Sequence, residues 1–201
     1  MSSSSNPDLW PVSLRTDRLV LRPIERGDVA ALSRLWTDTE VRRYFGGPVT
    51  GETLRAREEG CVAAFGAFSV VLATDMSMVG LVSVEPCSRR GGRTEVSYQL
   101  LPEHWGCGYG REAVVAAMSW ALDKVTSQQS EVVAVTQKAN ERSRRLLESI
   151  GMRLVDAFVE WGAEQVMYSM DRTGPGGPAS TAIREYGSPS GRSRASTGPI
   201  T

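Results

Sequence analysis

The sequence predicts an α+β fold in which a mixed, mostly antiparallel central sheet of about six to seven strands is flanked by about four to five helices. Strand and helix patterns follow one another in the order β-α-α-β-β-β-α-β-α-β-β, so consecutive strands outnumber β-α-β units. The 201 residues are 41% hydrophobic and 23% charged, which is typical of one globular domain with tails and excludes a wholly disordered chain.

The first elements are predicted by alternation and by capping residues. Leucines at every second position of residues 18–23 predict a strand. Asp28 is a typical helix N-cap, and the apolar residues of 29–36 recur at helical spacing. A second short helix is predicted over 40–44, ending before the Gly-Gly-Pro sequence at 46–48.

The middle of the chain contains a hairpin and the strand that follows it. Residues 53–64 have a helical pattern. Residues 68–73 and 78–84 are rich in β-branched side chains and flank the polar turn 74–77, which predicts an antiparallel pair. Residues 95–101 alternate again and form the next predicted strand.

The second half alternates helix and strand before it closes with a hairpin. A helix is predicted over 112–125 and a β-branched strand over 131–137. Asn140 is the expected N-cap of a helix that ends at Gly151, its expected C′ residue. We expect residues 153–161 and 165–171 to form the last two strands.

Domain boundaries follow from composition. We expect a flexible N-terminal segment over 1–13, one folded domain over 14–172, and a disordered tail over 173–201. The tail is rich in Gly, Pro and Ser and has too few large apolar residues to offset the entropy of ordering it.

The run from Trp105 to Ala113 is the most informative motif. Its alternating glycines, Gly106, Gly108 and Gly110, leave the main chain bare, so several N–H groups can point at one place. The helix that follows adds unpaired N–H donors and a positive dipole end. The motif therefore predicts an anion site suited to a phosphate or diphosphate, with a plain flexible connection as the alternative.

A nucleotide-binding β-α-β fold is a competing explanation, because Gly108-x-Gly110-x-x-Ala113 matches the dinucleotide fingerprint. Three features oppose it. Residues 102–106 separate the strand from the glycines, no acidic residue ends the strand over 131–137, and hairpins replace repeated β-α-β units.

Three segments resemble the GNAT acetyltransferase superfamily. Leu14–Pro23 looks like its opening strand, Glu95–Ala113 resembles its acyl-CoA signature, and Asn140–Gly151 is similar to its Asn-x-x-Ser helix. The resemblance extends from Leu14 to Asp171 and is strongest to the RimJ/RimL branch, which acetylates N-terminal amines of ribosomal proteins. It implies the GNAT acyl-CoA N-acyltransferase fold. Trp105 departs from the pattern, since many members carry Gln or Arg there, and Gly110 stands where this branch often has Ala.

The resemblance implies acetyl-CoA as the acyl donor and no metal. The pantetheine arm would lie between the strands over 95–101 and 131–137, as an added strand does. An N–H near Leu100 or Leu101 would stabilise the oxyanion. The diphosphate would rest on the main chain of the glycine loop, which comprises Gly106, Cys107, Gly108, Tyr109, Gly110 and Arg111.

The helix after Asn140 carries two further candidates. Asn140 is expected to cap the helix, and the resemblance adds a contact with the CoA arm. Ser143 shares the inward stripe of this helix, and the resemblance places it beside the cofactor sulfur as a hydrogen-bond donor to the leaving thiolate. The alternative for Ser143 is a hydrogen bond back to the carbonyl of Ala139.

A carboxylate is expected to help deprotonate the acceptor amine. Glu160 in the last hairpin is the first candidate base and Glu95 the second, with a solvated charge on a strand face as the alternative for either. Cys107 follows His104 by three residues, but its place in the phosphate loop favours a small filler over a nucleophile. We expect residues 37–64 and the hairpin after Arg153 to wall the acceptor site.

Composition narrows the partners and the location. The formal net charge is zero, which gives no general attraction to nucleic acid, and the longest apolar stretch is too short to span a membrane. Three widely spaced cysteines suit free thiols in a reducing cytoplasm. The expected acceptor is a primary amine, most simply a protein N-terminus, with a small-molecule amine as the alternative. A non-catalytic acyl-CoA sensor and a homodimer remain open.

Overall fold

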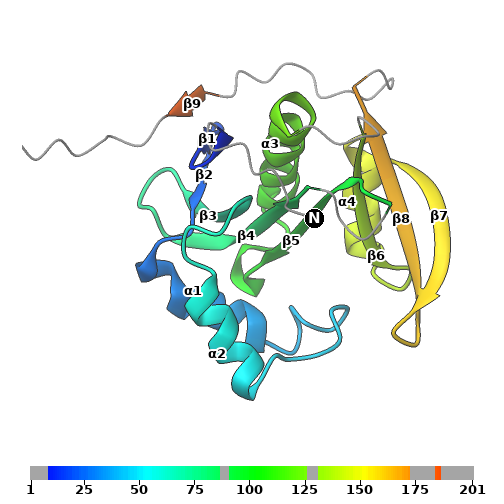
Figure 1. The fold of residues 1–201 in the computed structure, drawn as a ribbon, viewed down its shortest axis with the longest axis horizontal. Coiled ribbons are helices and arrows are strands. Elements are labelled where there is room, and N and C mark those ends of the chain that lie inside the picture. Colours follow the sequence, from blue (N-terminus) through cyan, green and yellow to red (C-terminus); the bar gives the residue numbers. More distant parts are fainter. Residues whose placement is uncertain (1–8, 87–90, 126–130, 173–183, 187–201) are drawn as a thin grey trace, which may run out of the picture.

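The computed structural model describes residues 9–86, 91–125, 131–172 and 184–186. These residues form a nine-stranded sheet in the order β7-β8-β6-β5-β4-β3-β2-β1-β9 (Figure 1). The strands are β1 (Ser13–Arg15), β2 (Leu19–Pro23), β3 (Ala67–Leu72), β4 (Met78–Glu85), β5 (Thr94–Leu100), β6 (Glu131–Gln137), β7 (Arg153–Glu160), β8 (Ala163–Asp171) and β9 (Arg184–Tyr186). The helices are α1 (Val29–Thr37), α2 (Gly51–Gly60), α3 (Tyr109–Lys124) and α4 (Glu141–Ser149), with short 3-10 turns η2 (Arg26–Asp28) and η3 (Pro102–His104).

The predicted fold class is confirmed, with more strands than expected. Every predicted strand is present, and the additional strands are β1 and β9, three residues each. Segments this short carry too little alternation to be recognised. β9 lies in the region predicted to be a disordered tail and pairs antiparallel with β1. The rest of that tail, and residues 1–8, lie outside the described residues, so the domain boundaries stay a prediction.

One parallel pairing distinguishes the centre of the sheet. All other neighbouring strands are antiparallel, whereas β5 and β6 are parallel and pair only at Thr94 with Val132 and at Glu95 with Val133. Beyond Glu95 the two strands part. The sheet therefore has a gap beside the carboxyl end of β5, where the sequence predicts a CoA arm.

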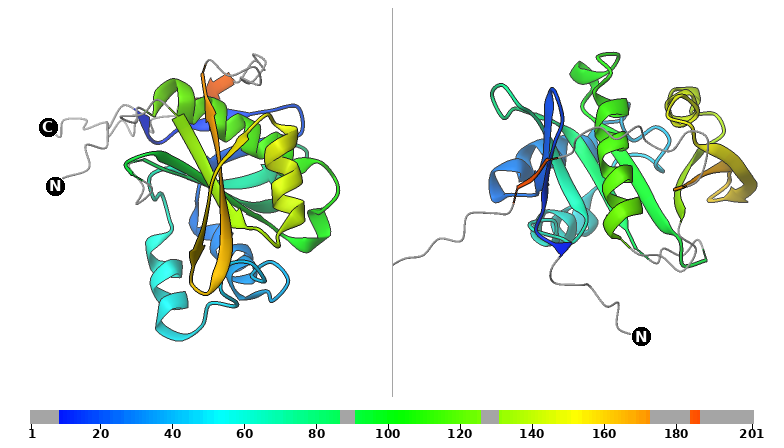
Figure 2. Two further views of the ribbon diagram at one scale, coloured as in Figure 1. Left: turned by 90° about the vertical axis from the view of Figure 1, so that its right-hand side faces the viewer. Right: turned by 90° about the horizontal axis from the view of Figure 1, so that it is seen from above.

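The two faces of the sheet are covered by different helices. Val82 and Val84 of β4 pack in the main hydrophobic cluster with α3, whereas Leu81, the residue before Val82, packs with α1 in the second cluster. This alternation is what a strand buried on both faces requires. Figure 2 shows α3 and α1 on opposite sides of the strands.

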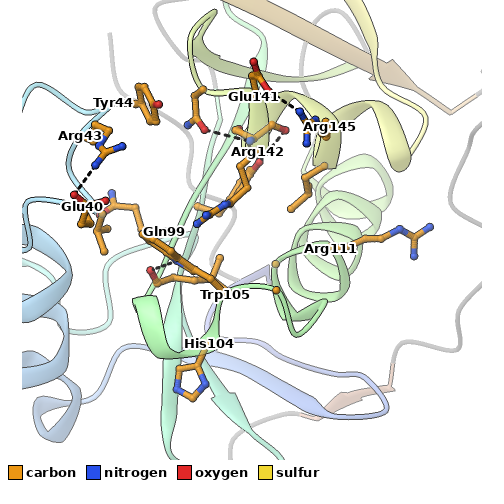
Figure 3. A pocket seen from close by; sticks show the side chains of 18 of the residues that line it. Glu40, Arg43, Tyr44, Gln99, His104, Trp105, Arg111, Glu141, Arg142 and Arg145 are labelled. Atoms are coloured by element: carbon orange, nitrogen blue, oxygen red, sulfur yellow. Dashed lines mark hydrogen bonds and ion pairs between the residues drawn. The ribbon is translucent and has the colours of Figure 1, made fainter.

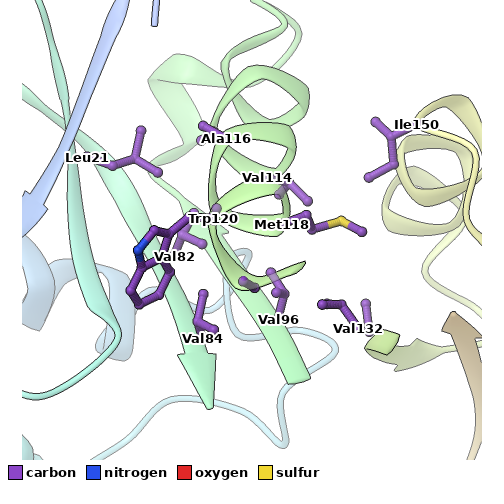
Figure 4. Packing of buried hydrophobic residues seen from close by; sticks show 14 of the residues in the cluster. Leu21, Val82, Val84, Val96, Val114, Ala116, Met118, Trp120, Val132 and Ile150 are labelled. Carbon is purple, nitrogen blue, oxygen red and sulfur yellow. The ribbon is translucent and has the colours of Figure 1, made fainter. Parts of the chain in front are cut away.

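Helix α3 fills the main core with small and large residues in turn. Val114 and Met118 face Val96 of β5 and Val132 of β6, and Trp120 lies against β4 (Figure 4). Alanines at 113, 116, 117 and 121 are also buried, which lets the helix approach the sheet closely. The buried surface of α3 is therefore wider than a single apolar stripe.

Two local predictions are wrong. Residues 40–44 are not a helix but consecutive turns. Asp38 accepts the N–H groups of Glu40 and Val41 as an N-cap does, but the main-chain bonds that follow are mostly of the tighter i−3 kind. The chain then turns at Gly46 and Gly47 with positive φ, and the Arg42 guanidinium donates to the Phe45 and Gly47 carbonyls in that turn.

Asp28 occupies the N-cap position of α1 but does not cap it. Its carboxylate instead accepts hydrogen bonds from the Arg22 guanidinium at 2.7 and 2.9 Å, from Ser69 Oγ at 2.7 Å and from the Glu25 N–H at 2.9 Å. Burial alone would raise the pKa of Asp28, but these donors outweigh it and the pKa is lowered. The carboxylate therefore joins β2, β3 and η2.

Candidate functional site

A cavity of about 720 Å³ opens where β5 and β6 part (Figure 3). Its walls come from the end of β5, the glycine loop, the first turn of α3, the start of α4 and the turns over residues 40–45. The structure thus brings together, as lining residues, Leu100, Gly106, Gly108, Gly110, Arg111, Asn140 and Ser143. The predicted wall over 37–64 is present through its residues 40–45, whereas no residue of the last hairpin lines the cavity.

The glycine loop presents unused main-chain donors. Gly106 and Gly108 have φ of +78° and +81°, a left-handed conformation that other residues adopt only with strain. Gly108 is the N-cap of α3. The first helical hydrogen bond of α3 runs from the Glu112 N–H to the Gly108 carbonyl, at 3.2 Å. Within the described parts of the chain, no acceptor pairs with the N–H groups of residues 106–111.

Arg18 and Glu112 hold the loop from outside. The Arg18 guanidinium donates to the Cys107 carbonyl at 3.0 Å, pairs with Glu112 at 2.7 Å and lies 4.7 Å from the centre of the Tyr109 ring. Glu112 also accepts from Thr16 Oγ1 at 2.6 Å and from the Arg18 N–H at 2.9 Å. Burial alone would raise the pKa of Glu112, but these hydrogen bonds lower it, so the carboxylate stays charged.

Gly110 allows α3 to approach the cavity wall. A Cβ at this position would lie 3.2 Å from Leu146 Cδ1 and 3.3 Å from Leu100 Cδ1. These distances are tighter than ordinary contacts, so a larger side chain would displace the leucines that line the cavity.

Only one of the two predicted oxyanion donors is available. The Leu101 N–H donates to the Val79 carbonyl of β4 at 2.9 Å. Because successive residues of a strand direct their main-chain groups to opposite neighbours, the Leu100 N–H faces the side where β6 has parted. The Leu100 carbonyl on that side accepts from the Trp105 indole at 2.9 Å. Leu100 is therefore the candidate donor.

Asn140 caps α4 as predicted, Ser143 lines the cavity, and a third residue contacts Ser143. Asn140 Oδ1 accepts the Ser143 N–H at 3.2 Å, which confirms the N-cap. Ser143 Oγ does not bond to Ala139 but lies 2.8 Å from the Tyr98 hydroxyl. Sequence reasoning missed Tyr98, although its position two residues before Leu100 puts it on the same face of β5. Burial raises the pKa of Tyr98 to about 12, although the Ser143 contact acts in the opposite direction.

The mouth of the cavity carries more positive than negative side chains. Four arginines and two glutamates line it, and both glutamates are paired, Glu40 with Arg43 at 2.5 Å and Glu141 with Arg145 at 2.5 Å. Arg142 lies over the Trp105 ring at 4.3 Å from its centre, and both side chains line the cavity (Figure 3).

The two candidate bases are not brought to the cavity. Glu95 lies at the opposite end of β5, opposite Val133, where β5 and β6 still pair. Glu160 lies at the end of the edge strand β7, opposite Ala163. Neither is among the lining residues, and neither are Leu101, Cys107 and Tyr109. The Cys107 side chain is exposed and its thiol contacts the Trp105 carbonyl at 3.7 Å.

Two further kinds of site were sought in the described ranges. No group of three or more His, Cys, Asp or Glu side chains there could hold a metal ion. None of the described helices has the length and apolar character needed to cross a lipid bilayer.

Comparison with known proteins gives consistent matches. A family model described as an acetyltransferase (GNAT) domain matches residues 18–153. An uncharacterised N-acetyltransferase of Bacillus subtilis, YoaA, is 26% identical over 156 residues, which cover 72% of this chain and 84% of that protein. The chain also matches an acetyltransferase (GNAT family) structure from Bacillus anthracis, with a TM-score of 0.69, 23% identity, and coverage of 79% of this chain and 97% of that one.

A second solved structure was determined with ligands. It is the spermidine N-acetyltransferase of Vibrio cholerae in complex with CoA and spermine, with a TM-score of 0.65 and 19% identity, covering 76% of this chain and 94% of that one. At this identity the likeness concerns the fold.

Proposed function

Because this chain belongs to the GNAT acetyltransferase family and is an acetyl-CoA-dependent N-acetyltransferase, we propose that its acceptor is a protein N-terminal α-amine, as in the RimJ/RimL branch. The observation that carries the donor site is the row of unpaired N–H groups over residues 106–111 at the wall of the cavity. Unpaired main-chain donors at a helix N-terminus fit a diphosphate. These residues would hold acetyl-CoA by its diphosphate.

The reaction is direct acyl transfer. The acceptor nitrogen bonds to the thioester carbonyl carbon, the C–S bond breaks, and the electron pair leaves with sulfur. The Leu100 N–H is the donor placed to stabilise the oxyanion, and such a donor contributes about 3–4 kcal/mol in other acyl-transfer sites. Ser143 would donate a hydrogen bond to the leaving thiolate.

The charge of the cavity supports an acceptor that needs little help to lose its proton. The excess of arginines opposes a polycation and favours the neutral form of an amine. A peptide α-amine has a pKa of about 7.7–8.0 and is partly neutral near pH 7, whereas a lysine amine, at about 10.4, is not. Both glutamates of the cavity are paired with arginines, so their charges are already compensated within the cavity wall.

A thiol-release assay tests the proposal. Acetyl-CoA is incubated with peptides that begin with Ala or Ser, with the same peptides blocked at the N-terminus but containing lysine, and with spermidine and amine antibiotics. We expect turnover with the unblocked peptides only. Turnover restricted to a small amine would replace the acceptor assignment, and binding of acetyl-CoA without CoA release from any amine would indicate a sensor.

A further inference from the structure

We propose that Tyr98 is a positioning residue for Ser143, with its hydroxyl donating to Ser143 Oγ and thereby directing the Ser143 proton into the cavity. The inference rests on the proposed donor site and on no particular acceptor. It concerns a residue that the sequence did not single out, and it follows from two observations, the contact itself and the place of both residues in the cavity, together with an assignment of the donor from the chemistry of the two hydroxyls.

The contact joins two elements that are distant in sequence. Tyr98 lies on β5 and Ser143 on α4, and their hydroxyl oxygens are 2.8 Å apart. The Tyr98 ring packs against the main hydrophobic core, and Asn140 fixes the first turn of α4 through the Ser143 N–H. Both side chains are half-buried and both line the cavity. The pair is therefore held from both sides at the wall where β5 and β6 part.

Either hydroxyl fits as the donor by geometry, and we assign the donated proton to Tyr98 because a neutral phenol is a stronger hydrogen-bond donor than an aliphatic hydroxyl. The raised pKa of Tyr98, about 12, keeps the phenol protonated. Its other acceptor, the Ser143 carbonyl, is 3.4 Å away, so Ser143 Oγ is the better placed. When Tyr98 donates, Ser143 Oγ acts as the acceptor and its own hydrogen remains. Within the described residues, no other acceptor takes that hydrogen.

The consequence is a chain of two donors that ends in the cavity. A hydroxyl that accepts one hydrogen bond becomes a stronger donor of the next. As the C–S bond breaks, the electron pair stays on sulfur and the Ser143 O–H donates to it. Both protons remain on their oxygens, and the proton that the amine loses goes to solvent. The pair thus lowers the basicity of the thiolate without transferring a proton.

The first test measures turnover in Tyr98→Phe with any amine that the wild type acetylates. We expect kcat to fall about 3- to 10-fold, the effect of one neutral hydrogen bond, with unchanged affinity for acetyl-CoA. In a Ser143→Ala background the same change should have no further effect. Additive losses, or a change in KM alone, would overturn the positioning role.

Tyr168→Phe is the matched control. Tyr168 on β8 also links the sheet to α4, through Glu148 at 2.6 Å and Arg144 at 3.3 Å, but it does not line the cavity. This variant reports the effect of loosening α4. A fall in kcat equal to that of Tyr98→Phe would show that Tyr98 only supports the helix.

The second test needs no acceptor, so it separates this inference from the proposed acceptor. Ultraviolet absorbance of the thiolate gives the pKa of the thiol of bound CoA, and desulfo-CoA is the blank for tyrosine ionisation. In the wild type we expect the thiol pKa of bound CoA to lie below that of unbound CoA. The pKa of bound CoA should rise by about 0.5–1 unit in Tyr98→Phe and by the same amount in Ser143→Ala. A value that is the same in the wild type and in Tyr98→Phe would refute the inference.

Discussion

Gly108→Val tests the diphosphate site at its most constrained position. Gly108 has φ of +81° and ψ of −1° at the N-cap of α3. A left-handed conformation costs a residue with a Cβ roughly 1–2 kcal/mol, and a β-branched side chain more. The loop should therefore leave this conformation and turn at least one N–H away from the cavity. A hydrogen bond to a charged group contributes about 1.5–3 kcal/mol, so the Kd for acetyl-CoA should rise about 10- to 150-fold.

Isothermal titration calorimetry with acetyl-CoA measures this Kd, and Gly92→Val is the control. Gly92 has φ of +78° in the turn before β5, and a Cβ there would meet no atom within 4 Å. Both variants should lose similar thermal stability, but only Gly108→Val should lose affinity. An unchanged Kd in Gly108→Val would refute the assignment of the loop, and equal losses of affinity would attribute the effect to general destabilisation.

Three other changes test the fold and the site. Asp28→Asn should lower the free energy of unfolding by about 3 kcal/mol at pH 7 by leaving the partly buried Arg22 poorly paired. Because the folded-state pKa of Asp28 is lowered, the stabilisation by its carboxylate is present above the ordinary Asp pKa and is lost as the pH falls through the folded-state pKa. Urea unfolding should therefore show a smaller difference in the free energy of unfolding between wild type and variant at pH 3 than at pH 7. An equal difference at both pH values would contradict this. Glu160→Gln should leave the pH profile of kcat unchanged, and a flattened alkaline limb would restore Glu160 as the base. In Gly80→Ala the new Cβ would lie 2.3 Å from the Gln99 carbonyl, so β4 and β5 must separate; thermal unfolding should show a loss of about 1–3 kcal/mol together with a fall in kcat, and wild-type behaviour would contradict the close approach.

Local patterns were sufficient for most elements of the fold. Residues 131–137 were predicted as a strand with the bounds that β6 has, because the β-branched residues that favour a strand lie within the segment itself. Asn140 and Gly151 marked the ends of α4 because capping depends on neighbouring residues alone. The helix predicted over residues 40–44 was wrong because the chain turns at once at Gly46 and Gly47, where the Arg42 guanidinium binds the loop carbonyls.

The site was predicted best where main-chain N–H groups, and not side chains, are the expected ligand donors. Alternating glycines indicate bare N–H groups whatever the rest of the fold, and the loop over 106–111 has them. Side chains were harder, because their neighbours depend on how the strands are arranged in the sheet. Glu160 looked close to the acceptor site, but its strand is at the edge of the sheet. Tyr98 was missed altogether, since its partner is 45 positions away in sequence.

The clamp formed by Arg18 and Glu112 limits how far the glycine loop can be separated from its own protein. Arg18 lies 89 positions before Cys107 and 94 positions before Glu112, the two residues that it binds. A peptide or chimaera carrying only residues 95–125 would keep the glycines and lose the contacts of Arg18 that hold the loop. Such a transplant should bind diphosphates poorly until an equivalent of the first two strands is supplied with it.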